Sequence, residues 1–233
     1  MKYLIVNGDD FGYSFGANKG IIKAHREGIV TSTSVLVDSI AAYEARDLIK
    51  KYPNLSVGLH FTVIDKETRL AWLKGTYKSL IKNQIKKEFE RQLKKFVEIV
   101  GKKPDHIDGH YHLHTHPRIK PLIHDYSKKH HIPVRAFGKV NFINKFYGQS
   151  RITRQTYLKG ISVENLLKIL SNLNDGVSEL MCHPAIVDED LLKISSYNKE
   201  RDYELKTLTD KRILDFIRNN NIKLINYRGL EES

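Results

Sequence analysis

Two patterns of hydrophobic and polar positions alternate along this chain from one end to the other. Short runs rich in β-branched and aromatic residues predict strands at 3–7, 31–37, 55–61, 106–109, 134–137, 179–183 and 223–227. Longer amphipathic runs between them predict helices at 17–27, 41–51, 83–100, 118–130, 163–172 and 209–219. This alternation predicts an α/β fold with a parallel sheet covered by helices, either closed into a barrel or doubly wound. Seven strand candidates favour a distorted or incomplete β/α barrel over an eight-fold one.

The chain reads as a single domain spanning residues 1–233. It has 233 residues and contains no internal repeat, low-complexity segment or Pro/Gly-rich linker. Two irregular stretches, 65–82 and 141–160, are typical of loops that could cover a site. The apolar run at 1–6 is too short for a signal peptide, and no later stretch could span a bilayer, so we expect a cytoplasmic protein without a membrane partner.

A net charge of +12 raises the question of a nucleic-acid partner. The lysines are spread through 74–103, 120–145 and 199–223 and are mixed with acidic residues. They form no aromatic-interleaved ribbon and no helix-turn-helix pattern. A solvated lysine-rich surface is therefore favoured over a polyanion site, and we expect no nucleic-acid partner.

Two adjacent carboxylates, Asp9 and Asp10, follow the first predicted strand. Placing both side chains in a hydrophobic core would be strongly destabilising, because burying an unpaired charge costs much free energy. One alternative is a turn in which either aspartate caps the next helix. The other is a polar site at the carboxyl end of a strand, where β/α folds gather their chemistry.

Histidines stand at three further strand ends. His60 ends the third strand, His183 ends the sixth, and five histidines and an aspartate occupy alternate positions from 106 to 116. In an extended chain, alternate side chains share one face. That face would suit a wet, metal-holding interior, since imidazole is the commonest protein ligand for divalent transition metals. The alternatives are a satisfied core histidine at 60 and a surface tract at 106–116.

Cys182 precedes His183 and is the only cysteine, so an intrachain disulfide and a cysteine-rich zinc cluster are excluded. Adjacent strand residues point to opposite faces, which favours a buried, inert thiol over a nucleophile.

Several of these motifs together resemble the YdjC-like proteins, which include chitooligosaccharide deacetylases. The segments that carry the resemblance are 7–12, 18–22, 28–34, 58–61, 106–114, 181–185 and 201–205. They cover nearly the whole chain in the expected order. Gly8 stands where the family often has alanine, and Gly109 where it often has serine. The stretch 141–160 matches poorly, which leaves the sugar preference open.

The resemblance implies a distorted β/α barrel related to the NodB-type polysaccharide deacetylases. It also implies one divalent metal ion, magnesium or zinc, and removal of acetyl groups from N-acetylated amino sugars or chitooligosaccharides through a metal-activated water. By the same likeness the metal ligands would be Asp10, His60 and His110. Asp9 would be the general base and His183 the general acid.

Four further residues are expected to contact the substrate: His112, His114, Arg135 and Trp72. Trp72 would offer a platform for a pyranose ring, although a core tryptophan is the alternative. The competing functions are another metal-dependent β/α-barrel hydrolase, either an amidohydrolase or a phosphoesterase, and a non-catalytic sugar-binding relative. The sequence leaves a homodimer open.

Overall fold

A parallel sheet forms the centre of the molecule. The structure is a computed structural model that describes residues 1–63, 78–150 and 152–232. Within these ranges seven strands pair in the order β4–β3–β2–β1–β6–β5, and β7 pairs with β1. The strands are β1 (Lys2–Phe11), β2 (Ser32–Val35), β3 (Ser56–Phe61), β4 (Ile107–Gly109), β5 (Asn141–Ile143), β6 (Gly176–Cys182) and β7 (Ile222–Leu224).

The sheet curls but does not close. Strand β1 pairs with β7 through residues 2–4 and with β2 through residues 7–11. Strands β4 and β5 end the two sides of the sheet and do not pair with each other in the described part of the chain. The fold is therefore the incomplete β/α barrel that the sequence predicts.

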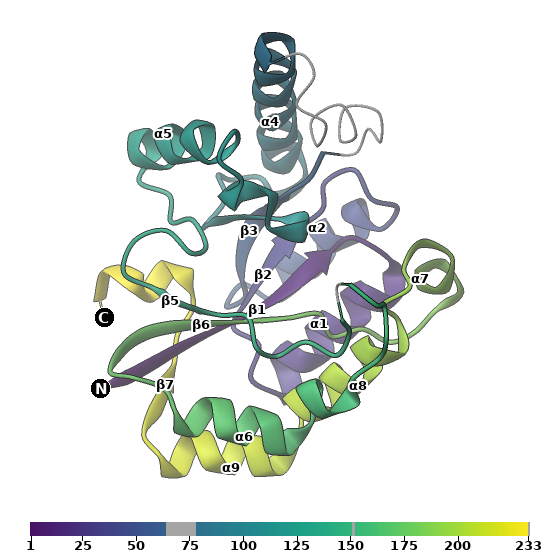
Figure 1. Ribbon diagram of the computed structural model, residues 1–233, viewed down its shortest axis with the longest axis vertical. Helices are drawn as coiled ribbons and strands as arrows, with labels where there is room; N and C mark the ends of the chain where they lie inside the picture. Colours follow the sequence, from purple (N-terminus) through teal and green to yellow (C-terminus); the bar gives the residue numbers. More distant parts are fainter. Residues whose placement is uncertain (64–77, 151, 233) are drawn as a thin grey trace.

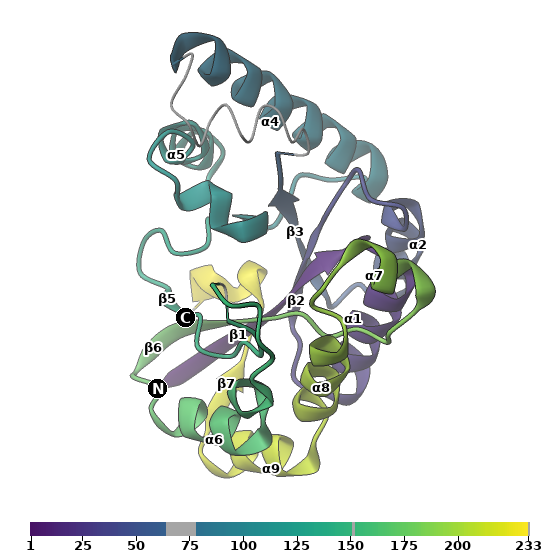
Figure 2. The ribbon, with the colours of Figure 1, turned by 45° about the vertical axis from the view of Figure 1, so that its right-hand side comes forward.

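Helices cover the outside of the sheet (Figures 1 and 2). They are α1 (Phe15–Glu27), α2 (Ala42–Lys51), α4 (Lys78–Val100), α5 (Lys120–His130), α6 (Val163–Ser171), α7 (Glu189–Ile194), α8 (Lys199–Leu208) and α9 (Lys211–Asn219). Short 3-10 helices add η1 (His110–Thr115), η2 (Leu158–Ile161) and η3 (Tyr227–Glu232). Helices α6 and α9 lie side by side at one end of the molecule, whereas α4 and α5 lie at the other (Figure 1). None of the described helices is long and apolar enough to cross a membrane.

Helix α1 anchors the segment that follows β6. Ser14 caps the helix, because its Oγ accepts a hydrogen bond from the Ala17 backbone N–H at 3.0 Å. A Cβ atom on Gly20 would lie 2.3 Å from the Cα atom of Ala185. Glycine at this position thus allows the helix to approach the chain just after His183, which fixes where that histidine lies.

Three predicted elements differ from the structure. Residues 134–137 are not a strand: Val134 makes a single bridge to Ile107, and positive φ angles at Ala136 and Gly138 then turn the chain away. Strand β5 lies instead within 141–160, a stretch predicted to be irregular. Helices α7 and α8 were not predicted either, because their short amphipathic runs are interrupted by polar residues.

The histidine-rich stretch also differs from its predicted extended form. Strand β4 ends at Gly109, and the chain then enters the 3-10 turn η1. Alternate positions from 106 to 116 therefore do not share one face, and the five histidines separate into different environments.

Candidate active site

The end of β1 presents two buried carboxylates to the open end of the sheet. The register with β2 shifts between Gly8 and Phe11, and Asp10 has a φ of 70°. Aspartate is one of the few residue types that tolerates this left-handed conformation. The irregularity lets Asp9 and Asp10 both face the site rather than opposite sides of the strand, and both are almost fully buried.

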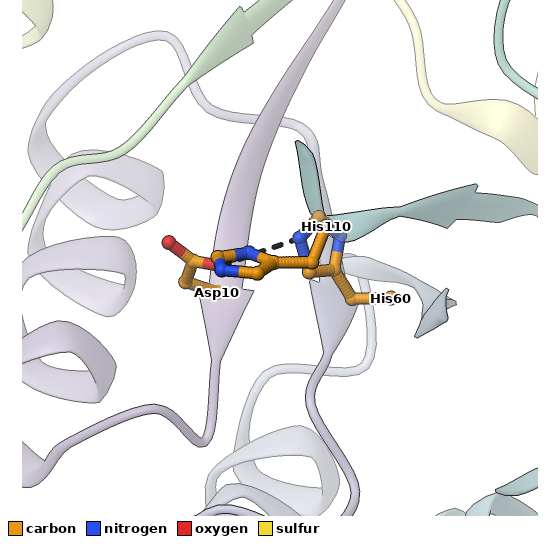
Figure 3. A group of neighbouring side chains, drawn as sticks. All are labelled: Asp10, His60 and His110. Atoms are coloured by element: carbon orange, nitrogen blue, oxygen red, sulfur yellow. Dashed lines mark ion pairs between the residues drawn. The ribbon is translucent and has the colours of Figure 1, made fainter. Parts of the chain in front are cut away.

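Asp10 lies beside two histidines from other strands. Its Oδ1 atom is 3.3 Å from Nε2 of His60 at the end of β3 and 3.2 Å from Nδ1 of His110 just after β4. Figure 3 shows the three side chains pointing toward one another. Their candidate ligand atoms all lie within 4.8 Å of one another. Asp10 Oδ1 is buried and has no hydrogen-bond partner among the described residues, as expected for an atom that faces a cation.

A second carboxylate orients His60. The Nδ1 atom of His60 lies 2.7 Å from Oδ1 of Asp108, whose Oδ2 accepts a hydrogen bond from Ser34 at 2.9 Å. If Nδ1 carries the proton, Nε2 offers its lone pair toward Asp10. Burial by itself would lower the pKa of His60, but Asp108 and Asp10 raise it to about 10. The cluster strongly attracts positive charge, and two imidazoles with one carboxylate are a donor set that suits a divalent metal ion.

Arg201 on α8 holds the remaining oxygen of Asp10. Its Nη2 atom donates to Asp10 Oδ2 at 2.7 Å. Burial would raise the pKa of Asp10, but the Arg201 guanidinium and His110 hold it well below its usual range. Asp10 is therefore ionised, with one oxygen neutralised by arginine and the other directed to the two histidines.

Asp9 belongs to a buried ion cluster around Arg135 that shares Asp108 with His60. The Arg135 guanidinium donates to both Asp9 oxygens, at 2.7 and 2.6 Å, and through Nε to Glu179 at 2.7 Å. Its Nη2 atom is also 2.9 Å from Asp108. Burial would raise the pKa of Asp9, but Arg135 outweighs that effect and the pKa is lowered. Asp9 is thus kept as a carboxylate next to the proposed metal ligands.

His183 follows β6 and lies against Glu204 of α8. The backbone N–H of His183 donates to Glu204, and the His183 Nδ1 atom is 3.7 Å from Glu204 Oε1. Tyr197 also donates to Glu204 through its hydroxyl group. Cys182 points away from the cavity, is fully buried and lies 3.3 Å from the Asn7 carbonyl. Burial raises the pKa of this thiol well above the usual value, and the prediction that it is buried is confirmed.

A cavity of about 430 Å³ connects these groups. Asp9, Asp10, His60, His110 and His183 all line it. His112 lines it as well.

Two predicted substrate-binding residues do not line the described cavity. His114 and Arg135 lie behind its wall and are almost fully buried. The guanidinium of Arg135 is occupied by the carboxylates of Asp9, Asp108 and Glu179. Trp72 lies outside the described residues.

Comparison with known proteins decides the family. Residues 3–219 match the YdjC-like protein family. The chain belongs to this family. A carbohydrate deacetylase from Thermoanaerobacter pseudethanolicus is 36% identical, with 99% of this chain and 100% of that protein covered. A chitooligosaccharide deacetylase from Proteus mirabilis is 33% identical, with 97% and 98% covered.

Solved structures agree with the fold of this YdjC-like protein. A crystal structure from Enterococcus faecalis V583, of a protein named for a candidate role in cellobiose-phosphate cleavage, has a TM-score of 0.82 at 26% identity and covers 98% of each chain. A family 4 carbohydrate esterase from Streptomyces lividans in complex with acetate has a TM-score of 0.56 at 15% identity, with 97% of this chain and 91% of that chain covered. The incomplete barrel is therefore a fold that this family 4 carbohydrate esterase shares.

Sequence reasoning missed three residues that shape the site: Asp108, Arg201 and Glu204. Asp108 was visible within the histidine-rich stretch but received no role, because its partner His60 is 48 residues away. Arg201 and Glu204 lie on the unpredicted helix α8. Both residues belong to the segment 201–205 that carries part of the family resemblance, and this was the signal that could have found them.

Proposed function

We propose that this chain, a carbohydrate deacetylase like its curated relatives, removes acetyl groups from N-acetylated amino sugars or their short oligosaccharides with the help of one divalent metal ion. The observation that carries the proposal is the cluster of Asp10, His60 and His110, in which the buried Oδ1 atom of Asp10 lies 3.3 and 3.2 Å from a nitrogen of each histidine. A non-catalytic sugar-binding protein would have little use for such a cluster at the base of its cavity.

The donor set favours zinc over magnesium. Imidazole nitrogen is a good ligand for zinc, whereas magnesium prefers oxygen ligands. A divalent ion held by Asp10, His60 and His110 would lower the pKa of a bound water and polarise the carbonyl group of the substrate. Arg201 would keep Asp10 ionised, and Asp108 would keep the Nε2 lone pair of His60 available.

The two groups beside this cluster supply the proton transfers. Asp9 is ionised and lines the cavity, so a carboxylate oxygen can accept the proton that the attacking water loses. Arg135 fixes the Asp9 carboxylate in place. His183 lines the same cavity with its Nδ1 atom toward Glu204, so Nε2 is the nitrogen that can give a proton to the departing amine.

Acetate release from a panel of N-acetylated sugars tests this function. We expect release by the untagged protein, loss of release after treatment with a chelator, and recovery when zinc is added back. Asp10→Asn should bind metal more weakly than the parent protein. Full activity in metal-free protein would disprove the metal proposal, and hydrolysis of other amides without release from any acetylated sugar would disprove the substrate class.

A further inference from the structure

The residue after His110 has a backbone conformation that bulky side chains rarely adopt. Tyr111 has a φ of 53° and His112 a φ of 58°, so two consecutive residues that are not glycine are left-handed. This conformation is destabilising for each of them. Tyr111 is 71% exposed, so burial of its ring does not offset that cost.

Neighbouring contacts hold this strained turn in place. The Thr115 hydroxyl donates to the His112 carbonyl at 2.8 Å, and the ring of His112 lies 5.6 Å from that of Phe142 on β5. Leu113 and His114 are buried directly after it. The turn places the ring centroids of Tyr111 and His110 4.1 Å apart. Most of the Tyr111 surface remains exposed to solvent at the cavity. Strain of this kind is concentrated at functional sites.

The side chains around Tyr111 match the surface of a sugar ring. Among the described lining residues, Tyr111 has the most exposed aromatic ring, since Tyr13 and Tyr147 are half-buried and Tyr197 is buried. The cavity is also lined by hydrogen-bonding side chains, those of Gln149, Ser150, Arg154, Ser195 and Ser196. A pyranose has an apolar face of C–H groups and a rim of hydroxyl groups, so one aromatic face and several polar partners complement it.

We propose that Tyr111 is the stacking platform for a pyranose ring of the acetylated substrate. The inference rests on the proposed function for its ligand class. The stacking role, expected from the sequence for Trp72, is thereby assigned to the residue next to His110. The strained turn serves to present the ring.

Three substitutions distinguish a sugar-stacking role of Tyr111 from a structural role in which Tyr111 only covers His110. Tyr111→Phe keeps the aromatic face, Tyr111→Ala removes it but keeps the backbone strain, and Tyr111→Gly removes both. We expect the glycine variant to melt at a temperature no lower than that of the parent protein, and a few degrees above that of the alanine variant. If Tyr111 were merely structural, both small variants would melt earlier than the parent protein.

Calorimetric binding of an N-acetylated glucosamine disaccharide provides the direct test. It is done in an Asp9→Asn background, which prevents turnover. We expect Tyr111→Ala and Tyr111→Gly to weaken binding about tenfold, equivalent to about 1.4 kcal/mol, and Tyr111→Phe to stay within about threefold. The three Tyr111 substitutions are also made in the parent protein, where Asp9 is intact. In these variants the metal content and the rate of hydrolysis of trifluoroethyl acetate, which has no sugar ring, should be unchanged.

Equal binding by all variants would overturn the platform, as would loss of metal or of trifluoroethyl acetate hydrolysis together with sugar binding. Absence of disaccharide binding by the parent protein would overturn it too. Binding that depends on Tyr111 in a protein that releases no acetate would instead disprove the proposed function and leave the platform in place.

Discussion

The Nδ1 atom of His60 lies 2.7 Å from Oδ1 of Asp108, and this pairing directs the opposite nitrogen of the ring toward Asp10. His60 on β3 and Asp108 on β4 are direct partners in the register of these parallel strands. The sheet itself therefore sets the orientation of a proposed metal ligand. Because carboxylates of this kind fix both the ring and its tautomer, Asp108 should matter for metal affinity although it is not a proposed ligand.

We predict that Asp108→Asn weakens zinc binding about 10–100-fold, the range typical of such supporting groups. An asparagine keeps the size but loses the charge that holds the His60 proton. Titration with a competing chelator measures the effect. The matched control is Asp105→Asn, since this carboxylate bonds to Val57 and Ser56 away from the cavity. Equal losses of zinc affinity in the two variants would show that Asp108 acts only through general stability.

The two adjacent aspartates should differ in phenotype. Asp9→Asn is expected to keep its metal and lose turnover about 10²–10⁴-fold, the size of a general-base contribution. Asp10→Asn should bind metal more weakly, because it removes a ligand charge. Metal content and acetate release measured on the same samples decide between the roles. The reversed pattern would mean that Asp9 is the ligand and Asp10 the base.

A third prediction concerns stability and pH at the surface. Asp38 forms ion pairs with Arg91 and Lys95 of α4, which joins this long helix to the loop after β2. Partial burial would raise the pKa of Asp38, but hydrogen bonds from Arg91 and Lys95 lower it. A carboxylate whose pKa is lower in the folded protein than in the unfolded chain stabilises the folded protein. This stabilisation is present at pH values above the pKa of the carboxylate in the unfolded chain, about 3.9. That stabilisation is lost as the pH falls through the folded pKa.

Asp38→Asn should therefore melt about 2–4 °C below the parent protein at pH 7, the shift expected for about 1 kcal/mol. The difference should shrink below a pH of about 4 and vanish in stronger acid. Thermal melts across this range provide the measurement. A constant difference at all pH values would show that Asp38 acts by packing or polarity rather than by charge.

The sequence predicted the frame of the molecule and most of the candidate site because both depend on local patterns. Alternating strands and helices identify a β/α fold, and strand ends gather at one edge of a parallel sheet. Asp9, Asp10, His60 and His183 were accessible in this way, and family resemblance separated their roles. All four do line one cavity.

What the sequence could not predict depends on contacts between distant residues. The pairing of Arg135 with Asp9 joins positions 126 residues apart, and nothing near Arg135 signals that three carboxylates surround it. The extended reading of 106–116 failed for a related reason. Local periodicity fits a strand, but the chain turns at Tyr111 and buries Leu113 and His114.

The last prediction concerns His183 and Glu204, where a catalytic and a structural role can be separated. An amine leaving a tetrahedral intermediate needs a proton, whereas a good leaving group such as a phenolate does not. His183→Ala should therefore abolish most release of acetate from an N-acetylated sugar, spare an activated aryl acetate, and leave metal content unchanged.

Glu204 contacts the backbone and lies near the ring of His183 without lining the cavity. Glu204→Gln should produce the same selectivity in milder form, since Glu204 accepts a hydrogen bond from the His183 backbone N–H and lies near its ring. Tyr197→Phe is the matched control, because it removes another contact of Glu204 while keeping the carboxylate. A parallel loss on both substrates in His183→Ala, together with a lower melting temperature, would instead make His183 a structural residue.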